Sequence, residues 1–295
     1  MHFWLTNEGI PIGEGSIPKT TIRHLNKLQG PWQSNWNSRT GGLSYSKIRL
    51  FKNMKVSIHQ DYDSMSQQAA SEIILQIKQK PEAVLCFASG ETPRQMCRFT
   101  VERAGRENID FSRCTFIGLD EWVGIPPTNE GSCNYFFQKE VFGPLRLSAD
   151  QIHVFDAMAK DLENECRKMD NAILRKGGID LMVVGIGMNG HIGFNEPGHD
   201  FDQFSHVAEL AEETRAVGQK YFRQVTALTK GLTLGLRHLM EARKLILLAN
   251  GAKKAEVIRK ALEEEVTPDF PASFVRNHAN ATVMLDEEAA SLLTN

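Results

Sequence analysis

From residue 54 onward, short apolar runs alternate with segments of helical periodicity, and few folds are compatible with this alternation. Six runs are predicted as strands, at residues 54–59, 83–88, 114–119, 179–186, 244–249 and 281–285. Helical spacing marks further segments, at residues 64–78, 92–103, 135–142, 162–174 and 253–264. Largely apolar strands separated by helices are typical of parallel sheets. The sequence therefore predicts an α/β fold: a single Rossmann-like domain with a mainly parallel sheet covered by helices on both faces.

The first 53 residues differ in composition from the rest of the chain. They hold three of the four tryptophans but only two acidic residues, Glu8 and Glu14, and their apolar residues show no sustained helical or strand periodicity. A disordered tail is normally poor in aromatic residues, so the segment resembles neither a domain nor an ordinary linker. Met54 opens the first regular strand. We therefore expect an N-terminal extension, residues 1–53, that is irregular or not native, and a folded domain, residues 54–295.

Composition excludes several classes of protein. The net charge is −2, without the clustered positive charge of a nucleic-acid-binding or anionic-membrane surface. Apolar runs are far shorter than the roughly 20 residues that span a bilayer, and the N-terminus lacks the apolar core of a secretory signal. The five cysteines are scattered, odd in number and without a CxxC pair. We therefore expect a reduced, cytoplasmic protein with no disulfide framework, no zinc site, and no nucleic acid or membrane partner.

Polar loops follow the predicted strands, and ligands of parallel sheets bind beyond the carboxyl ends of the strands. Residues 89–92, with the sequence SGET, come just before a predicted helix. Their hydroxyls and amides fit either a phosphate cradle or a simple helix N-cap. Asp120 and Glu121 follow the next strand. Adjacent carboxylates there are either solvated loop charges or include a partly desolvated general base.

A third loop, residues 185–190, matches the GxGxxG pattern of dinucleotide-binding sites. That pattern requires a helix to open at its third glycine, whereas residues 193–198 contain two glycines and a proline. We therefore reject the dinucleotide interpretation. The same loop carries His191 and Glu196. A single histidine is more often structural than catalytic, but a nearby carboxylate can orient the imidazole and favour its protonation.

In these loops the sequence resembles the glucosamine-6-phosphate deaminase family, also called isomerases, and more distantly the 6-phosphogluconolactonases. The resemblance runs from about residue 54 to the C-terminus. Five segments carry it, at residues 89–93 (SGETP), 116–124 (FIGLDEWVG), 185–198 (GIGMNGHIGFNEPG), 227–233 (ALTKGLT) and 251–255 (GAKKA). The GHIGFNEPG stretch is highly specific, since the lactonases do not continue into FNEPG. The resemblance implies conversion of glucosamine 6-phosphate and water into fructose 6-phosphate and ammonia, in amino-sugar catabolism, without metal or organic cofactor.

The resemblance also implies roles for individual residues. Asp120 would take the proton from C2 of the sugar and deliver it to C1, while His191 would act as acid and base at the ring oxygen. Glu196 would orient and tune His191. Asn189 stands where the main glucosamine members carry Asp, and an amide can only hydrogen-bond and orient. We do not expect this difference to inactivate the chain.

The substrate phosphate is expected, by the same resemblance, at six residues: Ser89, Gly90, Glu91, Thr92, Lys220 and Lys254. Family members often carry Arg at the position of Lys220. Lysine offers a point charge rather than a fork, so we expect looser phosphate geometry. Without the resemblance, Lys254 would be interpreted as a solvated surface charge.

Other functions stay open: a deaminase for the galactosamine epimer, a 6-phosphogluconolactonase, and a non-catalytic sugar-phosphate sensor. The sequence also leaves open whether the protein forms a homo-oligomer. Some family members are activated by an N-acetylated amino-sugar phosphate that binds a basic cluster between subunits. The matching positions here are His206 and Ala208, with Arg215 further along, which makes a poor anion site. We therefore expect no activation of this kind.

Overall fold

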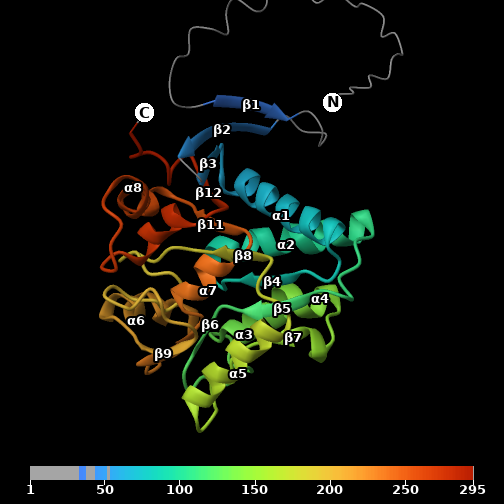
Figure 1. Cartoon of the computed structure of the whole chain (residues 1–295), viewed down its shortest axis with the longest axis vertical. Helices are drawn as coiled ribbons and strands as arrows, with labels where there is room; N and C mark the ends of the chain where they lie inside the picture. The colour runs from blue at the N-terminus through green and yellow to red at the C-terminus, as the bar shows by residue number, and fades with distance from the viewer. Residues whose placement is uncertain (1–32, 38–43, 52–53, 295) are drawn as a thin grey trace, which may run out of the picture. The chain divides into compact units, whose positions relative to one another are not determined.

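The computed structural model describes residues 33–37, 44–51 and 54–294, which belong to one compact unit, Trp32–Asn295. Within these residues, nine strands form a sheet in the order β1-β2-β3-β12-β11-β8-β4-β5-β7 (Figure 1). Neighbours from β3 to β7 are parallel, whereas β2 pairs antiparallel with β1 and β3. The strand bounds are β1 Gln33–Asn37, β2 Ser44–Phe51, β3 Met54–His59, β4 Val84–Phe87, β5 Thr115–Gly118, β7 Ile152–His153, β8 Leu181–Val184, β11 Leu245–Ala249 and β12 Ala281–Asp286.

Helices cover both faces of this sheet, as the sequence predicts. Val84 and Cys86 of β4 belong to a core that includes residues of α5, α7 and α8. Leu85 and Phe87, which point to the opposite face, belong to a core that includes residues of α1, α2 and α3. The helix bounds are α1 Tyr62–Gln79, α2 Glu91–Glu107, α3 Cys133–Phe137, α4 Gly143–Leu145, α5 Leu162–Arg175, α6 Glu212–Gly218, α7 Leu236–Glu241 and α8 Ala255–Glu263.

The predicted strands and helices are present, with ends that differ by a few residues. The strand expected at 179–186 is shorter, because the backbone leaves the sheet after Val184 and enters the glycine-rich loop. The helix expected at 135–142 consists of α3 followed by a π-helical turn, η2 (Gln138–Phe142). Among the described residues no helix combines the length and apolar character that a membrane crossing requires.

Two strands, β1 and β2, lie in the segment that we expected to be irregular. Strand β2 pairs with β3 from Ser46 opposite His59 to Phe51 opposite Met54. The expectation is therefore wrong for these strands. Pairing with an open sheet edge uses backbone groups and needs no sustained apolar periodicity, so these two strands could not be predicted from periodicity. Residues 1–32 lie outside the described residues, and the domain boundary at residue 54 stays a prediction.

A second sheet, which the sequence analysis did not predict, lies next to the site described below. It has three antiparallel strands in the order β6-β10-β9: β6 Asp120–Trp122, β10 Lys230–Thr233 and β9 His206–Glu209. Only Leu119 separates β5 from β6, so the chain passes directly from the main sheet to the small one. This passage holds Asp120 at the carboxyl end of β5.

Candidate active site

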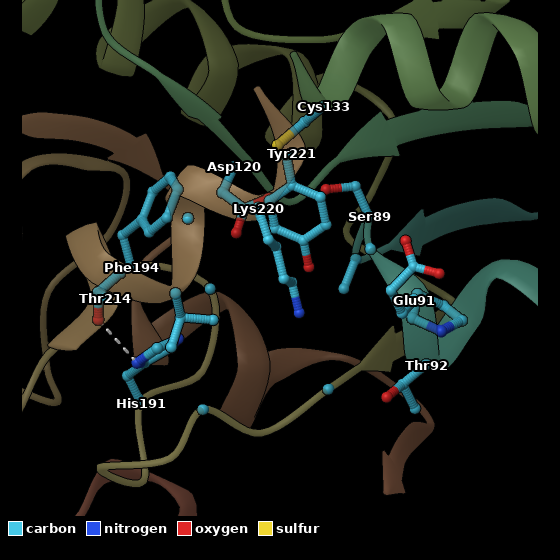
Figure 2. Close-up of a pocket in the computed structure, with 18 of the residues that line it drawn as sticks. Ser89, Glu91, Thr92, Asp120, Cys133, His191, Phe194, Thr214, Lys220 and Tyr221 are labelled. Atoms are coloured by element: carbon cyan, nitrogen blue, oxygen red, sulfur yellow. Dashed lines mark hydrogen bonds between the residues drawn. The ribbon is translucent and has the colours of Figure 1, made fainter. Parts of the chain in front are cut away.

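A pocket of about 220 Å³ lies where β4, β5, β8 and β11 end (Figure 2). This edge of the sheet is where parallel α/β folds bind ligands. Every predicted site residue except Glu196 lines the pocket: Ser89, Gly90, Glu91, Thr92, Asp120, Asn189, His191, Lys220 and Lys254. The structure thus brings together loops that are up to 165 positions apart in the chain, from Ser89 to Lys254. Glu196 lies behind the lining and contacts it through Asn189.

Asp120 enters this pocket without a partner for one of its oxygens. Its Oδ1 is buried and makes no hydrogen bond with any described residue. Burial raises the pKa of Asp120 from 3.8 to about 7, and the negative charge of Glu121 adds to the shift. A carboxylate with a pKa near neutrality can both accept and return a proton at physiological pH. The geometry therefore gives Asp120 the properties of a general base.

Glu121 is buried beside it but is fully hydrogen-bonded. Its carboxylate accepts from the backbone N–H groups of Trp122, Cys133 and Asn134 at 2.9, 2.9 and 2.8 Å. It also accepts from the Ser132 hydroxyl at 2.7 Å. Glu121 does not line the pocket. Its role is structural: it fastens the start of α3 to β6 and so fixes the wall next to Asp120.

His191, Asn189 and Glu196 form a hydrogen-bonded group at the other side of the pocket. Asn189 Oδ1 lies 2.7 Å from His191 Nδ1 and accepts from the backbone N–H of His191 at 3.2 Å. Asn189 Nδ2 donates to Glu196 Oε2 at 2.9 Å. The two contacts with His191 require the amide oxygen on that side, so His191 donates its Nδ1–H. Nε2 is then left as the proton acceptor.

Two neighbours restrict the imidazole further. A Cβ atom at Gly187 would lie 2.2 Å from the His191 ring, so only glycine leaves room for it. Thr214 of α6 places Oγ1 3.1 Å from His191 Nδ1 (Figure 2). Burial lowers the pKa of His191; the Lys254 charge acts in the same direction and the Glu196 charge opposes it. The ring is therefore neutral at pH 7, with a fixed tautomer.

The loop after β4 and two lysines form the cationic part of the pocket. Gly90 precedes α2 with φ +112°, a conformation that favours glycine, and exposes the backbone amides at the start of this 17-residue helix. Glu91 pairs with Arg94 at 2.9 Å, which leaves its backbone amide as its contribution to an anion site. The Thr92 hydroxyl donates to Asn250 Oδ1 at 2.7 Å.

Lys254 is partly buried, in contrast to the solvated charge expected from its sequence context alone. Its Nζ donates to the Ile186 carbonyl at 2.6 Å. Burial lowers the pKa of Lys254 to about 8, and the nearby Lys220 charge contributes. Two cations that repel one another in a pocket gain stability when an anion binds between them. Among the described residues no group of three or more His, Cys, Asp or Glu side chains could hold a metal ion.

Several residues that line the pocket were not predicted from the sequence, among them Cys133, Thr214 and Tyr221. Thr214 and Tyr221 come from α6 and the turn η4 (Gln219–Tyr221), which together span only ten residues. No motif marks this segment. The cationic Lys220 beside Tyr221 was the only signal that the segment reaches the site.

Comparison with known proteins agrees with this geometry. The sequence profile of the family described as glucosamine-6-phosphate isomerases/6-phosphogluconolactonase matches residues 60–284. The chain belongs to this family. A glucosamine-6-phosphate deaminase of Thermoanaerobacter pseudethanolicus is 39% identical over 241 residues, which cover 81% of this chain and 95% of that protein. A glucosamine-6-phosphate deaminase of Shouchella clausii is 40% identical over 235 residues, covering 79% of this chain and 95% of its own length.

Solved structures of the family share the fold. A structure described as a monomeric glucosamine-6-phosphate deaminase superposes with a TM-score of 0.78 at 37% identity, covering 80% of this chain and 99% of that chain. The 6-phosphogluconolactonase from Trypanosoma brucei superposes with a TM-score of 0.65 at 19% identity, covering 83% of this chain and 100% of its own. The second likeness concerns the fold alone.

Proposed function

We propose that this chain is a glucosamine-6-phosphate deaminase, which converts glucosamine 6-phosphate and water into fructose 6-phosphate and ammonia. The observation that carries the proposal is the pairing, in one pocket, of a desolvated carboxylate with an oriented neutral imidazole. Asp120 supplies the first and His191 the second. A reaction that opens a sugar ring and then moves a proton between neighbouring carbons requires two such groups. The relatives named above support the choice of substrate.

The phosphate of the substrate would bind first at the cationic end of the pocket. The amides of residues 89–92 and the ammonium groups of Lys220 and Lys254 are the donors there. This anchor fixes the sugar by a group that takes no part in the chemistry. The bound ring then lies between Asp120 and His191, so binding energy from the phosphate contributes to correct orientation.

Ring opening would use His191. Its Nε2 accepts the proton of the C1 hydroxyl and returns it to the ring oxygen as the C1–O5 bond breaks. The proton arrives on an imidazole whose Nδ1–H is already donated to Asn189, which in turn donates to Glu196. The negative charge of Glu196, 3.7 Å from Nδ1, stabilises the imidazolium that forms.

Isomerisation would use Asp120. In the open-chain sugar, Asp120 takes the proton from C2 while the C1 carbonyl oxygen receives a proton from the substrate ammonium group, which gives the enolamine. Asp120 then delivers its proton to C1, which leaves an iminium group at C2. Water then adds at C2 and ammonia leaves. A carboxylate whose pKa is raised to about 7 is a stronger base than a solvated one, which favours removal of a proton from carbon.

An ammonia-release assay tests the proposal. Wild-type protein is given glucosamine 6-phosphate and galactosamine 6-phosphate side by side, and hydrolysis of 6-phosphogluconolactone is followed separately. We expect ammonia and fructose 6-phosphate from the glucosamine substrate, with a higher kcat/KM than for its epimer. Preference for the epimer, lactone hydrolysis alone, or binding without turnover would replace the proposal by the corresponding alternative.

Two further properties belong to the same proposal. The solved glucosamine-6-phosphate deaminase named above is described as monomeric, and we propose a monomer for this chain as well. We also propose a cytoplasmic location, as expected from the scattered cysteines. All five are free and buried. Gel filtration with light scattering tests the first property, and fractionation of cells that express the full chain tests the second.

A further inference from the structure

Tyr221 reaches the pocket from a segment that carries no recognised motif. It ends the turn η4, and its hydroxyl lies against the loop before α2: a Cβ atom at Gly90 would be 3.1 Å from Tyr221 Oη. Figure 2 shows the hydroxyl and the Lys220 ammonium directed toward the same part of the pocket. The phenol therefore lies among the groups assigned above to the phosphate. The Tyr221 side chain is partly buried at this position.

The surroundings keep this phenol protonated and orient it. Burial raises the pKa of Tyr221 to about 12, with contributions from the charges of Glu91 and Asp120. Its hydroxyl is thus a hydrogen-bond donor throughout the physiological range. The backbone N–H of Glu91 faces the phenol oxygen as a donor, and among the described residues none accepts a hydrogen bond from the phenol. The Lys220 ammonium lies 4.9 Å from the centre of the Tyr221 ring, a favourable cation–π separation that fixes the two side chains relative to each other.

We propose that Tyr221 is a further substrate-binding residue whose phenol donates a hydrogen bond to a phosphate oxygen of the substrate, an inference that rests on the proposed function. The pairing has a chemical reason. The Lys220 ammonium attracts a phosphate but imposes little direction, since its charge is compact and its stem is flexible. The phenol on a rigid ring supplies a directed donor at the adjacent position. Together they provide charge and geometry, which an arginine would supply in one side chain.

The phenol could instead act on the reacting end of the sugar, because Asp120 is close enough to influence its pKa. The two roles differ in their kinetics. A donor to the phosphate binds substrate and transition state equally, so its loss raises KM and leaves kcat unchanged. A donor at C1 or C2 would change kcat. We assign the Tyr221 hydroxyl to the substrate phosphate.

The test replaces Tyr221 with Phe, which keeps the ring and the contact with Lys220 but removes the hydroxyl. The matched control is Tyr135→Phe: Tyr135 of α3 is partly buried but does not line the pocket. For Tyr221→Phe we expect KM for glucosamine 6-phosphate to rise about tenfold, the effect of losing one hydrogen bond to a charged group. The inhibition constant of inorganic phosphate should rise equally, and kcat should stay within about twofold. Unphosphorylated glucosamine should be processed equally by both enzymes.

An activity-independent measurement completes the test. Inorganic phosphate should raise the Tm of the wild type and of Tyr135→Phe, and should raise that of Tyr221→Phe less at the same concentration. Equal phosphate binding by Tyr221→Phe and wild type overturns the inference, as does a fall in kcat with unchanged phosphate binding. A wild type that binds phosphate but releases no ammonia would refute the proposed function instead. The Tm comparison would still decide the role of Tyr221.

Discussion

Asp120 and Glu121 are adjacent in the chain, yet their carboxylates occupy different environments. Side chains alternate across a strand, so β6 directs one into the pocket and the other towards α3. Glu121 accepts four hydrogen bonds, whereas Asp120 Oδ1 has no partner among the described residues. Apart from the family resemblance, which assigns the base to Asp120, the sequence left both carboxylates as candidates for either role. Strand β6, too short to predict, separates the base from the structural carboxylate.

Replacing Asp120 with Asn is expected to abolish activity and stabilise the fold. A general base is worth at least about 10²-fold in rate, so kcat should fall by that factor or more while KM changes little. The folded pKa of about 7 lies above the ordinary value of 3.8, so ionised Asp120 costs stability as the pH rises through this interval. The Tm of Asp120→Asn should therefore exceed that of wild type at pH 8, and the difference should vanish near pH 4. A variant that keeps more than about a tenth of wild-type kcat would remove Asp120 from the mechanism.

The pKa values of Asp120 and Lys254 together predict a narrow pH optimum for kcat/KM. Asp120 must be ionised to take a proton, so kcat/KM should fall as the pH drops through about 7. Lys254 must be charged to hold the phosphate, so kcat/KM should also fall as the pH rises through about 8. Lys254→Arg keeps its charge at high pH and should move only the alkaline limb upward. An alkaline limb that stays in place would assign it to another group, such as the substrate amine.

At the scale of elements, Glu121 connects β6 to the beginning of α3, and its replacement by Gln tests this connection. An amide has one acceptor oxygen and would direct its NH₂ group at backbone donors. Each lost hydrogen bond to the carboxylate costs about 1.5–3 kcal/mol, so thermal unfolding should show a clearly lower Tm. Loss of the negative charge should also lower the pKa of Asp120 and shift the acidic limb of kcat/KM to lower pH.

Glu102→Gln is a suitable control, because Glu102 is an exposed carboxylate on α2 with a long 3.7 Å ion pair to Arg106. It should leave both the Tm and the pH profile unchanged. If Glu121→Gln resembled this control in both measurements, the connection between β6 and α3 would contribute nothing to the site.

The main sheet could be predicted from the sequence because its central strands are buried on both faces and are apolar runs. The three loops of the site follow from it, since parallel strands end at one edge. The small sheet could not be predicted, because β6, β9 and β10 have three or four residues each, too few to show a period. Thr214 and Tyr221 were missed for a related reason. Their positions depend on how the segment after β9 folds back, which no local pattern encodes.

At the scale of the whole molecule, the first 53 residues are expected to be dispensable for activity. Strands β1 and β2 extend the sheet beyond β3, while the pocket lies where β4, β5, β8 and β11 end, and no residue of β1 or β2 lines it. The family profile begins at residue 60. A variant of residues 54–295 should therefore keep the kcat and KM of the full chain. A second variant, residues 44–295, retains β2, which pairs with the edge of β3. If the uncovered edge of β3 promotes self-association, this variant should self-associate less than the variant of residues 54–295. An insoluble or inactive short variant would show that the removed segment supports the core.

The kinetics of the whole molecule are expected to be hyperbolic and insensitive to N-acetylglucosamine 6-phosphate. By the family resemblance, the positions of the effector-binding cations are His206 and Ala208, both on β9. His206 is buried, burial lowers its pKa, and its Nδ1 donates to the Phe204 carbonyl, so it is neutral at pH 7. Ala208 is buried and apolar. Arg215, on α6, leaves one cation where a phosphate needs several charge-assisted bonds.

The test is a substrate titration with and without the effector, using the full chain. A monomer has no subunit interface for the effector to bind, and without a second site the substrate curve has no reason to become sigmoidal. We expect superimposable hyperbolic curves apart from competition at the substrate pocket, because the effector shares the phosphate and the sugar. Competition raises the apparent KM and never lowers it. A sigmoidal curve that the effector converts to a hyperbola would contradict both the monomer and the missing anion site, and Arg215→Ala would then show whether α6 has taken over that role.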